Sequence, residues 1–533
     1  MSALRSKNCR RFDSLLILPV VDSNRTTDAM LSAVTVNLIY FLSALIGYLV
    51  YRYKKRYNYW RDLGVPYIGA SGDIIFETTK NKAQVLQDRY NALSRHPYGG
   101  IFQASKPYLL LRDPEIVRTV LIKDFSHFTD RGMVFHEELD PLTAHIFNLG
   151  GQRWKNIRTK LVPTFSSGKL KTMFPLMEQC IHNLNGYLDA KLARSDEFEV
   201  RELMLKFATD VIGTCAFGFN CNAIADGESE FRAIGRKLAP NSLKFRFRQV
   251  LRSIHPDIIR WLGWKGFNRE VEDFFMGVTR ETIRYREQNQ DKRNDFMQLM
   301  INLQHEERNA GQGDNDAELL FADHIVAAHV FVFFVAGFET TATTLANCLY
   351  ELALNPEVAE KLQAEIQRVL DSRGGKLDYD ALKEMRYMEC ALEETLRKYP
   401  PVGFLDRVCT KAYELPNSSL LIKENLNVVI PVYSLHYDPQ YYPEPQRFDP
   451  DRFNEENRSK IVPGTYLPFG DGPRICIGMR FAMMEAKAAL TVILKNYTVH
   501  PTSKTQIPLV LEKNAFILRP EKGIHLKFQK RAK

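Results

Sequence analysis

The segment Phe469–Gly478, which reads FGDGPRICIG, constrains this chain more than any other part of the sequence. Gly470 and Gly472 allow a tightly bent backbone whose N–H groups can converge on one point. Arg474 lies two residues before Cys476, and the residues after the cysteine show a helical pattern of apolar side chains. We therefore expect Cys476 to end a loop at a helix N-terminus. The helix dipole and the arginine would stabilise a thiolate there, and a thiolate can bind a metal.

This loop resembles the haem-binding loop of cytochrome P-450 enzymes, in which the matching cysteine is the axial ligand of the haem iron. The resemblance makes Cys476 the iron ligand and places Phe469 and Gly470 at the cofactor, which is haem b. A thiolate ligand favours cleavage of the O–O bond. Ile475 departs from the pattern, because relatives often carry Asn at this position. We expect ligation to survive this change and the local hydrogen bonding to differ.

The resemblance runs from about Tyr51 to the C-terminus. It implies the cytochrome P-450 fold, which is mostly α with small β-sheets (α+β), preceded here by an N-terminal transmembrane helix. The sequence agrees in outline, since Ile101–Leu111 is strand-like and helical patterns dominate from Gly151 to Pro400. No internal repeat or long linker divides residues 67–533, which we interpret as one haem-thiolate catalytic domain.

Leu31–Val50 contains no charged side chain, and about 20 apolar residues can cross a bilayer as a helix. A cleaved signal peptide is the rival interpretation, but its apolar core is usually shorter and ends in small residues. Only Arg25 lies closely before the run. Five basic residues follow it: Arg52, Lys54, Lys55, Arg56 and Arg61. This asymmetry predicts an uncleaved single-pass anchor with the catalytic domain in the cytosol.

Residues 51–66 are predicted to form a basic and aromatic linker that ends in a hinge at Gly64-Val65-Pro66. Trp60 and the nearby tyrosines are expected at the level of the lipid headgroups. Residues 1–30 form a leader whose status stays open. It could be an alternative start, an error in the gene model or a lumenal tail.

Composition limits the classes of function. The net charge of +9 is modest for 533 residues and fits a basic docking patch or an anionic membrane surface. It is not typical of nucleic-acid binding, so we expect no nucleic-acid partner. The eight cysteines are scattered without a CxxC pair, which predicts mostly free thiols in a reducing compartment.

Asp316–Leu354 is predicted to be one long buried helix, because its central part is apolar nearly all round. A second transmembrane span is the alternative, but the apolar run is short and bounded by charged residues. Within it lies Ala336-Gly-Phe-Glu-Thr-Thr341, where a threonine can bond back to the carbonyl four residues earlier. The resemblance assigns Thr340 to an oxygen-binding groove and Glu339 to proton supply. Packing by small residues is the alternative.

Glu394 and Arg397 lie three residues apart on a predicted helix, where an ion pair can form. A surface pair of this type contributes little. The resemblance instead implies a buried structural triad of Glu394, Arg397 and Arg447, the last within Pro445-Gln-Arg-Phe448. We assign this triad to support of the haem loop rather than to chemistry.

Trp154 and Arg158 lie four residues apart on another predicted helix. In the family the matching pair meets a haem propionate. Arg474 and Arg407 are further candidates for the propionates, because a guanidinium matches a carboxylate in shape.

Residues that match the family's variable recognition segments are all apolar, which predicts a large lipophilic pocket. They are Phe135, Phe147, Phe334, Phe404, Leu405 and Phe516. Ordinary core packing is an equal alternative for each. The apolar segment Leu251–Trp264 is a candidate for contact with the membrane surface, where lipophilic substrates concentrate.

The resemblance implies an NADPH-dependent cytochrome P-450 monooxygenase of the endoplasmic reticulum membrane, the microsomal type. Such an enzyme inserts one oxygen atom from dioxygen into a lipophilic substrate. Its electrons come through a separate NADPH–cytochrome P-450 reductase, with cytochrome b5 as a second candidate donor, since we find no Gly-rich dinucleotide fingerprint.

Motif details look most like the clan of insect family-six and vertebrate drug oxidases. Xenobiotic detoxification and endogenous lipid or hormone metabolism are both open, as is the oligomeric state. A haem-binding sensor, and an isomerase or dehydratase of oxygenated lipids, are the rival functions. Consumption of NADPH separates the monooxygenase from both rivals.

Overall fold

A computed structural model of the chain describes residues 23–531 apart from 75–76, 78, 134, 220, 227–228, 238–256, 291 and 311–318. The chain forms two compact units, Met1–Asn58 and Tyr59–Lys533. Most of the predicted leader, and residue 316 at the start of the predicted long helix, lie outside the described residues.

The first unit contains α1 (Ser23–Tyr57), which continues beyond the predicted apolar run. Its last turn carries Lys54, Lys55 and Arg56, where positive charge favours the C-terminal end of the helix dipole. Thr35–Tyr57 is long and apolar enough to cross a membrane. Four of the five basic residues that follow the apolar run are therefore part of the same helix, whereas Arg61 lies in the short helix α2 (Tyr59–Asp62).

The second unit begins earlier than the sequence suggests. Trp60, in the short helix α2 (Tyr59–Asp62), is fully buried, and its indole N–H donates to the Ile101 carbonyl (3.1 Å). A Cβ at Gly100 would lie 2.2 Å from this ring, so glycine is needed for the close packing. The prediction that Trp60 lies at the headgroups is therefore wrong. The predicted hinge also packs on the domain, since Gly100 N–H donates to the Pro66 carbonyl (2.7 Å).

The strands of the second unit form small sheets. The largest has the order β1-β2-β7-β4, with β1 (Tyr98–Gln103) antiparallel to β2 (Lys106–Leu111). β7 (Asn427–Ile430) is parallel to β2 and antiparallel to β4 (Leu405–Val408). The other sheets are β3-β9-β8 and β5-β6. Their strands are β3 (Glu197–Glu199), β5 (Tyr413–Glu414), β6 (Leu421–Ile422), β8 (Tyr497–Pro501) and β9 (His525–Lys530).

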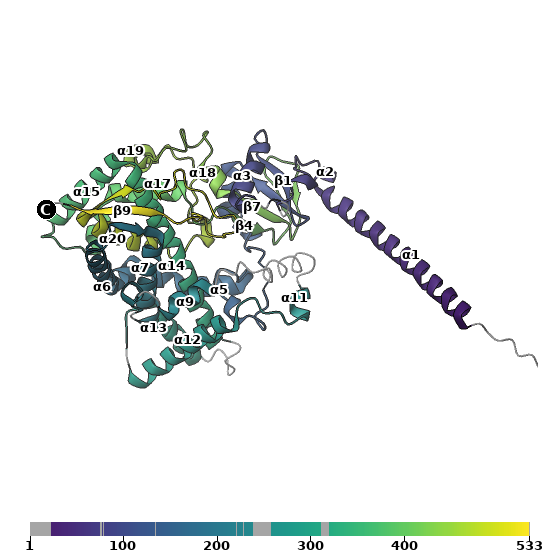
Figure 1. Ribbon diagram of the computed structural model, residues 1–533, viewed down its shortest axis with the longest axis horizontal. Coiled ribbons are helices and arrows are strands. Elements are labelled where there is room, and N and C mark those ends of the chain that lie inside the picture. The colour runs from purple at the N-terminus through teal and green to yellow at the C-terminus, as the bar shows by residue number, and fades with distance from the viewer. Residues whose placement is uncertain are drawn as a thin grey trace, which may run out of the picture. The chain divides into compact units, whose positions relative to one another are not determined.

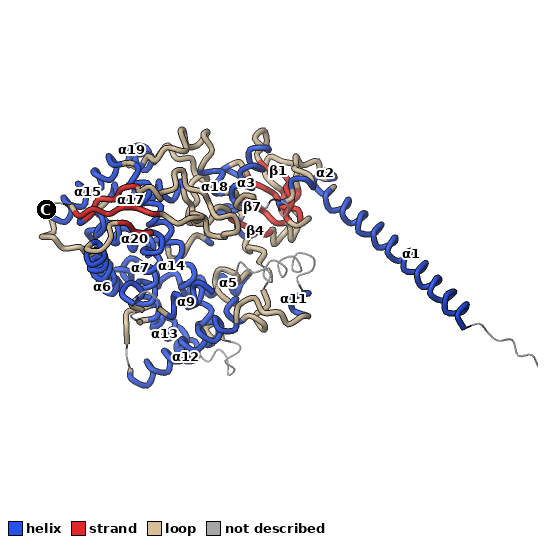
Figure 2. The backbone as a smooth tube through the Cα atoms, in the orientation of Figure 1, coloured by secondary structure: helices blue, strands red, loops and turns tan. Residues whose placement is uncertain are grey.

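Helices contain far more of the described residues of this unit than strands do (Figures 1 and 2). They are α3 (Lys82–Ala92), α4 (Pro114–Arg118), α5 (Gly151–Leu161), α6 (Ser167–Leu192), α7 (Val200–Ile212), α8 (Ala223–Asp226), α9 (Glu230–Lys237), α11 (Asp257–Trp261), α12 (Arg269–Asn289), α13 (Phe296–Asn309), α14 (Asp323–Leu354), α15 (Pro356–Asp371), α16 (Tyr379–Glu384), α17 (Arg386–Lys398), α18 (Val432–His436), α19 (Glu455–Arg458) and α20 (Met479–Asn496). The fold is thus mostly helical with small sheets, as predicted.

Helix α14 forms the centre of this unit. Its C-terminal half, from Thr341 to Ala353, is buried throughout and belongs to a core shared with α6, α7, α17 and α20. Its N-terminal half packs in a second, phenylalanine-rich cluster with α12 and α13. Although α14 is long and apolar enough to span a bilayer, most of its apolar window is buried, as expected for a core helix.

Candidate active site

The loop before α20 folds as its glycines predict. Gly470 and Gly472 have φ values of 73° and 69°, a region that favours glycine. A Cβ at Gly472 would lie 1.9 Å from the Leu121 carbonyl oxygen, so any larger residue would force the loop away. The loop closes through a bond from the Cys476 N–H to the Phe469 carbonyl (2.9 Å), and α20 begins at Met479.

Cys476 is the one exposed cysteine among the described residues. The protein around it nevertheless desolvates the thiol and raises its pKa. The backbone N–H groups of Gly478 and Met479, together with Arg158 and Arg131, act in the opposite direction. Cys476 is thus an accessible thiol that is surrounded by protein and by donors to an anion. A bound metal cation would complete the stabilisation of its thiolate.

Four arginines from distant segments gather around this loop. Arg158 of α5 donates to the Ile475 carbonyl (2.8 Å), and Arg474 donates to the Leu149 carbonyl (2.7 Å). Arg131 lies near the Arg474 carbonyl (3.5 Å). Arg407 of β4 is 1% exposed. Arg131 was not predicted from the sequence, because its contact spans 343 positions and no local motif marks it.

The arginine group carries more positive charge than its protein partners neutralise. Burial lowers the pKa of all four guanidinium groups, to about 10 for Arg407 and about 9 for Arg474. Arg407 Nε and Arg474 Nη1 are buried without a hydrogen-bond partner. The Asp130 carboxylate lies 3.7 Å from the Arg474 guanidinium. These donors fit the two carboxylates of a haem next to the Cys476 thiol.

Trp154 supports this group from α5. Its side chain is 4% exposed, and the Arg474 guanidinium lies 4.1 Å from the ring centroid. A cation over an indole face is stabilised by the ring quadrupole. The predicted spacing of Trp154 and Arg158 on one helix is therefore present, and both side chains reach the loop that holds Cys476.

On α14, Thr340 donates its hydroxyl to the Ala336 carbonyl (2.6 Å), which is the backward bond predicted from the sequence. The helix remains continuous through this point. Ala336 is exposed although most of α14 is buried, so a surface opens beside Thr340.

Glu339 lies in a network of ion pairs that the sequence did not predict. Its Oε1 accepts from Arg201 Nη2 (2.9 Å) and from Arg519 Nη1 (2.6 Å). Arg519 also pairs with Glu512 (2.5 Å). Glu339 retains 17% side-chain exposure, so the carboxylate is held by one oxygen and still reaches solvent.

Two members of the predicted triad form a buried ion pair in the structure, and the third lies at the surface. Glu394 and Arg397 are both fully buried and joined by two bonds of 2.7 and 2.8 Å. Burial lowers the pKa of Arg397, but Glu394 more than offsets this and the pKa is raised. The side chain of Arg447 is 66% exposed and lies near Glu444. Arg447 offers only its carbonyl to Arg397 (3.3 Å).

Arg452, rather than Arg447, is the second arginine beside Glu394. Its Nε lies 3.5 Å from Glu394 Oε1, and its side chain is 14% exposed. The chain has the pattern Pro-x-Arg-Phe twice, at 445–448 and at 450–453. Only the second copy lies in a helical turn, η8 (Pro450–Phe453), that packs on α17. The repeated pattern was thus visible in the sequence, but its three-dimensional context was not.

The predicted substrate contacts differ in how far their side chains are buried. Phe334 is fully buried between Phe217, Phe231 and Phe338, the arrangement expected of the core-packing alternative. Phe516, by contrast, is 51% exposed and lies edge-on to Phe404.

The remaining predicted contacts are half-buried. Leu405 lies beside Gly470, at which a Cβ would be 3.9 Å from both leucine methyl groups. The Phe147 ring lies 4.1 Å below the Arg131 guanidinium. Phe135 packs at the edge of the phenylalanine-rich cluster. Of the predicted membrane-contact segment, residues 251–256 lie outside the described residues, and Trp261 and Leu262 are exposed.

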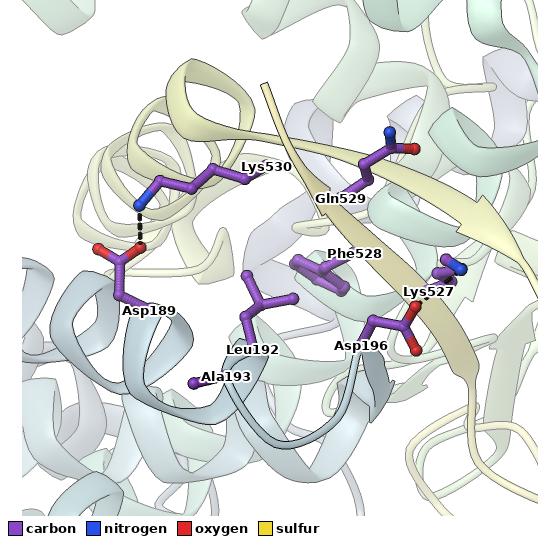
Figure 3. A pocket seen from close by; sticks show the side chains of 8 residues that line it. All are labelled: Asp189, Leu192, Ala193, Asp196, Lys527, Phe528, Gln529 and Lys530. Carbon is purple, nitrogen blue, oxygen red and sulfur yellow. Dashed lines mark hydrogen bonds and ion pairs between the residues drawn. The ribbon is translucent and has the colours of Figure 1, made fainter. Parts of the chain in front are cut away.

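A separate cleft of about 580 Å³ lies between the end of α6 and β9 (Figure 3). Ion pairs from Lys530 to Asp189 and from Lys527 to Asp196, both 2.7 Å, neutralise the charges along it. No predicted site residue lines this cleft. It is therefore not the site built around Cys476.

Comparison with known proteins agrees with this arrangement. The family model described as Cytochrome P450 matches residues 66–528. "Probable cytochrome P450 6a20" of Drosophila melanogaster is 37% identical over 502 residues, which cover 92% of this chain and 99% of the relative. "Cytochrome P450 6k1" of Blattella germanica is 38% identical over 510 residues, which cover 92% of this chain and 96% of the relative.

Proposed function

This chain belongs to the cytochrome P450 family and is a haem-thiolate monooxygenase, and from this premise we propose that it oxidises lipophilic xenobiotics. The observation that carries the proposal is the accessible Cys476 thiol within a group of buried arginines, with apolar side chains such as Leu405 nearby. The resemblance of the sequence motifs to insect family-six detoxification enzymes implies xenobiotics as the substrate class, and relatives of family six are among the similar proteins. Endogenous lipids or hormones are the second candidate class.

We propose Cys476 as the iron ligand, with Trp154, Arg158, Arg407 and Arg474 as the residues that hold the haem carboxylates. Phe469 and Gly470 would form the loop surface that faces the cofactor. When bound, the haem supplies the activation of dioxygen. The part of the protein is to hold the thiolate as an anion, to neutralise the carboxylates and to orient the substrate.

Proton supply is assigned to Glu339 and Thr340. Glu339 is held through one oxygen by Arg201 and Arg519, and its side chain is 17% exposed, so the carboxylate can contact water. The Thr340 hydroxyl, which bonds to the Ala336 carbonyl, can turn and donate at the surface beside it. Both groups would then supply protons for the chemistry of the bound cofactor.

The substrate region is assigned to Phe135, Phe147, Phe404, Leu405 and Phe516. The exposed Phe516 ring supports this assignment most directly. An apolar lining with few polar anchors would select substrates by shape and lipophilicity. It would therefore accept several related molecules rather than one.

We further propose that α1 anchors the chain in the endoplasmic reticulum membrane, with the catalytic domain in the cytosol. The basic residues at the C-terminal end of α1 support this orientation. NADPH–cytochrome P450 reductase would supply electrons, with cytochrome b5 as a second donor. We expect the sequons at Asn417, Asn457 and Asn496 to carry no glycan in microsomes. An endoglycosidase-sensitive mass shift mapped to any of them would contradict this topology.

The direct test is reconstitution of the full chain with the reductase, NADPH and isotopically labelled dioxygen, using a lipophilic alkoxycoumarin as the probe. A monooxygenase acting on such molecules places one labelled oxygen atom in the product and consumes NADPH. Product formation without NADPH would favour an isomerase or dehydratase. Haem binding with neither product formation nor NADPH consumption would favour a sensor.

A further inference from the structure

Three segments that are distant in the sequence meet beside the substrate region. They are the start of α3, residues 401–405 and residues 511–520. A Cβ at Gly403 would lie 2.6 Å from Ala83 Cβ and 3.0 Å from Leu518 Cδ1, so glycine is needed for this close packing. The three backbones therefore form one junction.

Asn81 joins the C-terminal segment to α3. Its side chain is 1% exposed, and its amide nitrogen donates to the carbonyls of Glu512 (2.7 Å) and Ala515 (3.1 Å). The same side chain also forms the N-terminal cap of α3. Lys82, the residue that follows the cap, is therefore held beside the segment that carries Phe516.

Lys82 and Phe516 contact the same aromatic ring. The Lys82 ammonium lies 3.8 Å from the centroid of the Phe404 ring, and the Phe516 ring lies edge-on to Phe404 with 6.0 Å between centroids. Phe404 is 7% exposed, whereas Phe516 is 51% exposed. Leu405, the next residue along β4, lies beside the loop that carries Cys476. A cation and an exposed aromatic ring thus lie at the rim of the substrate region.

The positive charge of Lys82 has no counter-charge within the described part of the chain, where its contact is the Phe404 ring. Neighbouring cations differ in this respect, since Lys80 pairs with Asp88 (2.7 Å) and Arg519 is held by two glutamates. Lys82 is also the first residue of α3, where the helix dipole adds to its positive charge. A half-buried ammonium in this setting favours an anion beside it.

We propose that Lys82 and Phe516 recognise aromatic carboxylates, which makes planar lipophilic acids a preferred substrate class; this rests on the proposed function. The carboxylate would pair with the Lys82 ammonium, and the ring would pack on the exposed face of Phe516. The apolar remainder would extend past Leu405 toward Cys476. A neutral molecule of the same shape would keep the ring contact and lose the ion pair.

Calorimetric binding to the haem-loaded full chain in nanodiscs of neutral phosphatidylcholine tests this recognition, with empty nanodiscs as the background. The probes are 2-naphthoate and 2-naphthamide, which share their ring system and differ in charge. Wild type should bind the carboxylate at least about threefold more tightly than the amide, and added salt should reduce this preference. Lys82→Gln should bind both probes equally, and Lys82→Arg should restore the preference.

The matched control is Lys80→Gln, which removes a neighbouring charge that Asp88 already neutralises and should leave the preference unchanged. A wild-type preference below about threefold, or one that Lys82→Gln retains, would overturn the proposal. Phe516→Ala should weaken the binding of both probes by a similar factor. Unchanged affinities in that variant would overturn the role of the ring.

An anionic lipid headgroup offers Lys82 the same chemistry as a free carboxylate. Adding phosphatidylserine to the nanodiscs should leave the affinity ratio of wild type to Lys82→Gln for 2-naphthoate unchanged. Loss of that ratio would show that Lys82 binds lipid and would overturn the proposal. Alkoxycoumarin oxidation tests the proposed function separately. Oxidation without a charge preference overturns only the recognition by Lys82, whereas a charge preference without oxidation supports that recognition and overturns the proposed function.

Discussion

Two glutamates of this protein lie in ion pairs, Glu394 on α17 and Glu339 on α14, and their surroundings differ. Glu394 is fully buried, and its carboxylate bonds to Arg397 through both oxygens and to the Asp449 N–H (3.0 Å). Glu339 is 17% exposed and uses a single oxygen for both of its arginines.

This difference separates a structural carboxylate from one that can take part in chemistry. Burial raises the pKa of Glu394 although Arg397 opposes this, and the loss of either partner would leave the other buried without its counter-charge. A partly exposed carboxylate with a free oxygen can exchange protons with water. We therefore attribute stability to the α17 region and proton transfer to the α14 region, and the following variants test this division.

The largest effect is expected for Arg397→Ala. The variant leaves Glu394 buried without its bidentate partner, which typically costs about 3–5 kcal/mol. Denaturant unfolding and the yield of haem-loaded protein are the measurements. The matched control is Arg447→Ala, which should change the unfolding free energy by no more than about 0.5 kcal/mol because that side chain is exposed.

Arg452→Ala belongs to the same test and should fall between the two, at about 1–3 kcal/mol, because Glu394 keeps Arg397. A larger loss in Arg447→Ala than in Arg452→Ala would restore Arg447 to the triad. A normal yield of Arg397→Ala would show that the buried pair is not needed for folding.

Thr340→Ala should affect chemistry and leave the fold intact. Proton delivery by a positioned group typically contributes about 10²–10⁴-fold in rate, so its loss should divert reduced oxygen away from product. We expect normal haem content, continued NADPH consumption, more hydrogen peroxide and less oxidised substrate. The measurement is the ratio of product to NADPH oxidised. An unchanged ratio would assign the role to another donor, such as Thr341 or water.

A smaller, pH-dependent effect on stability is expected from a buried histidine of the α14 region. His329 of α14 is fully buried, one ring nitrogen lacks a partner, and burial lowers its pKa from 6.5 to about 4. The unfolded chain therefore binds a proton between these values and the folded protein does not, so stability falls as the pH decreases through this window.

Between pH 6.5 and 5, we expect wild type to lose about 1–2 kcal/mol more unfolding free energy than His329→Leu. Urea unfolding at both pH values measures this, and equal losses would contradict the assignment. Burial also lowers the pKa of His436 of α18, to about 3, but both of its ring nitrogens have partners, the Arg397 carbonyl (3.0 Å) and the Leu467 N–H (2.9 Å). His436→Leu should be destabilised at both pH values.

The sequence predicted best those features whose geometry is local. The loop at Cys476 and the pair Glu394–Arg397 each lie within ten consecutive residues, so spacing and backbone conformation determine them. The long-range partners were not predictable in this way. Arg131 meets the loop from 343 positions away, and Arg201 meets Glu339 from 138 positions away.

The differences between the sequence-based expectations and the structure have a common physical cause. Phe334 and Trp60 are apolar residues, and the same residue type suits a pocket, a membrane interface or a core. Their burial is decided by packing against other segments, which one-dimensional patterns do not encode. Arg447 was preferred to Arg452 because both follow the same four-residue pattern, and only the fold shows which copy packs on α17.

The central claim is that Cys476 is the thiolate ligand of the haem iron, and the reduced carbon monoxide complex tests it most directly. Wild type and the control Cys180→Ala, which removes a buried cysteine of α6, should both show the red-shifted Soret band of a thiolate-bound haem. Cys476→Ala should lose this band. A retained band in Cys476→Ala would contradict the account, since another ligand would then hold the iron.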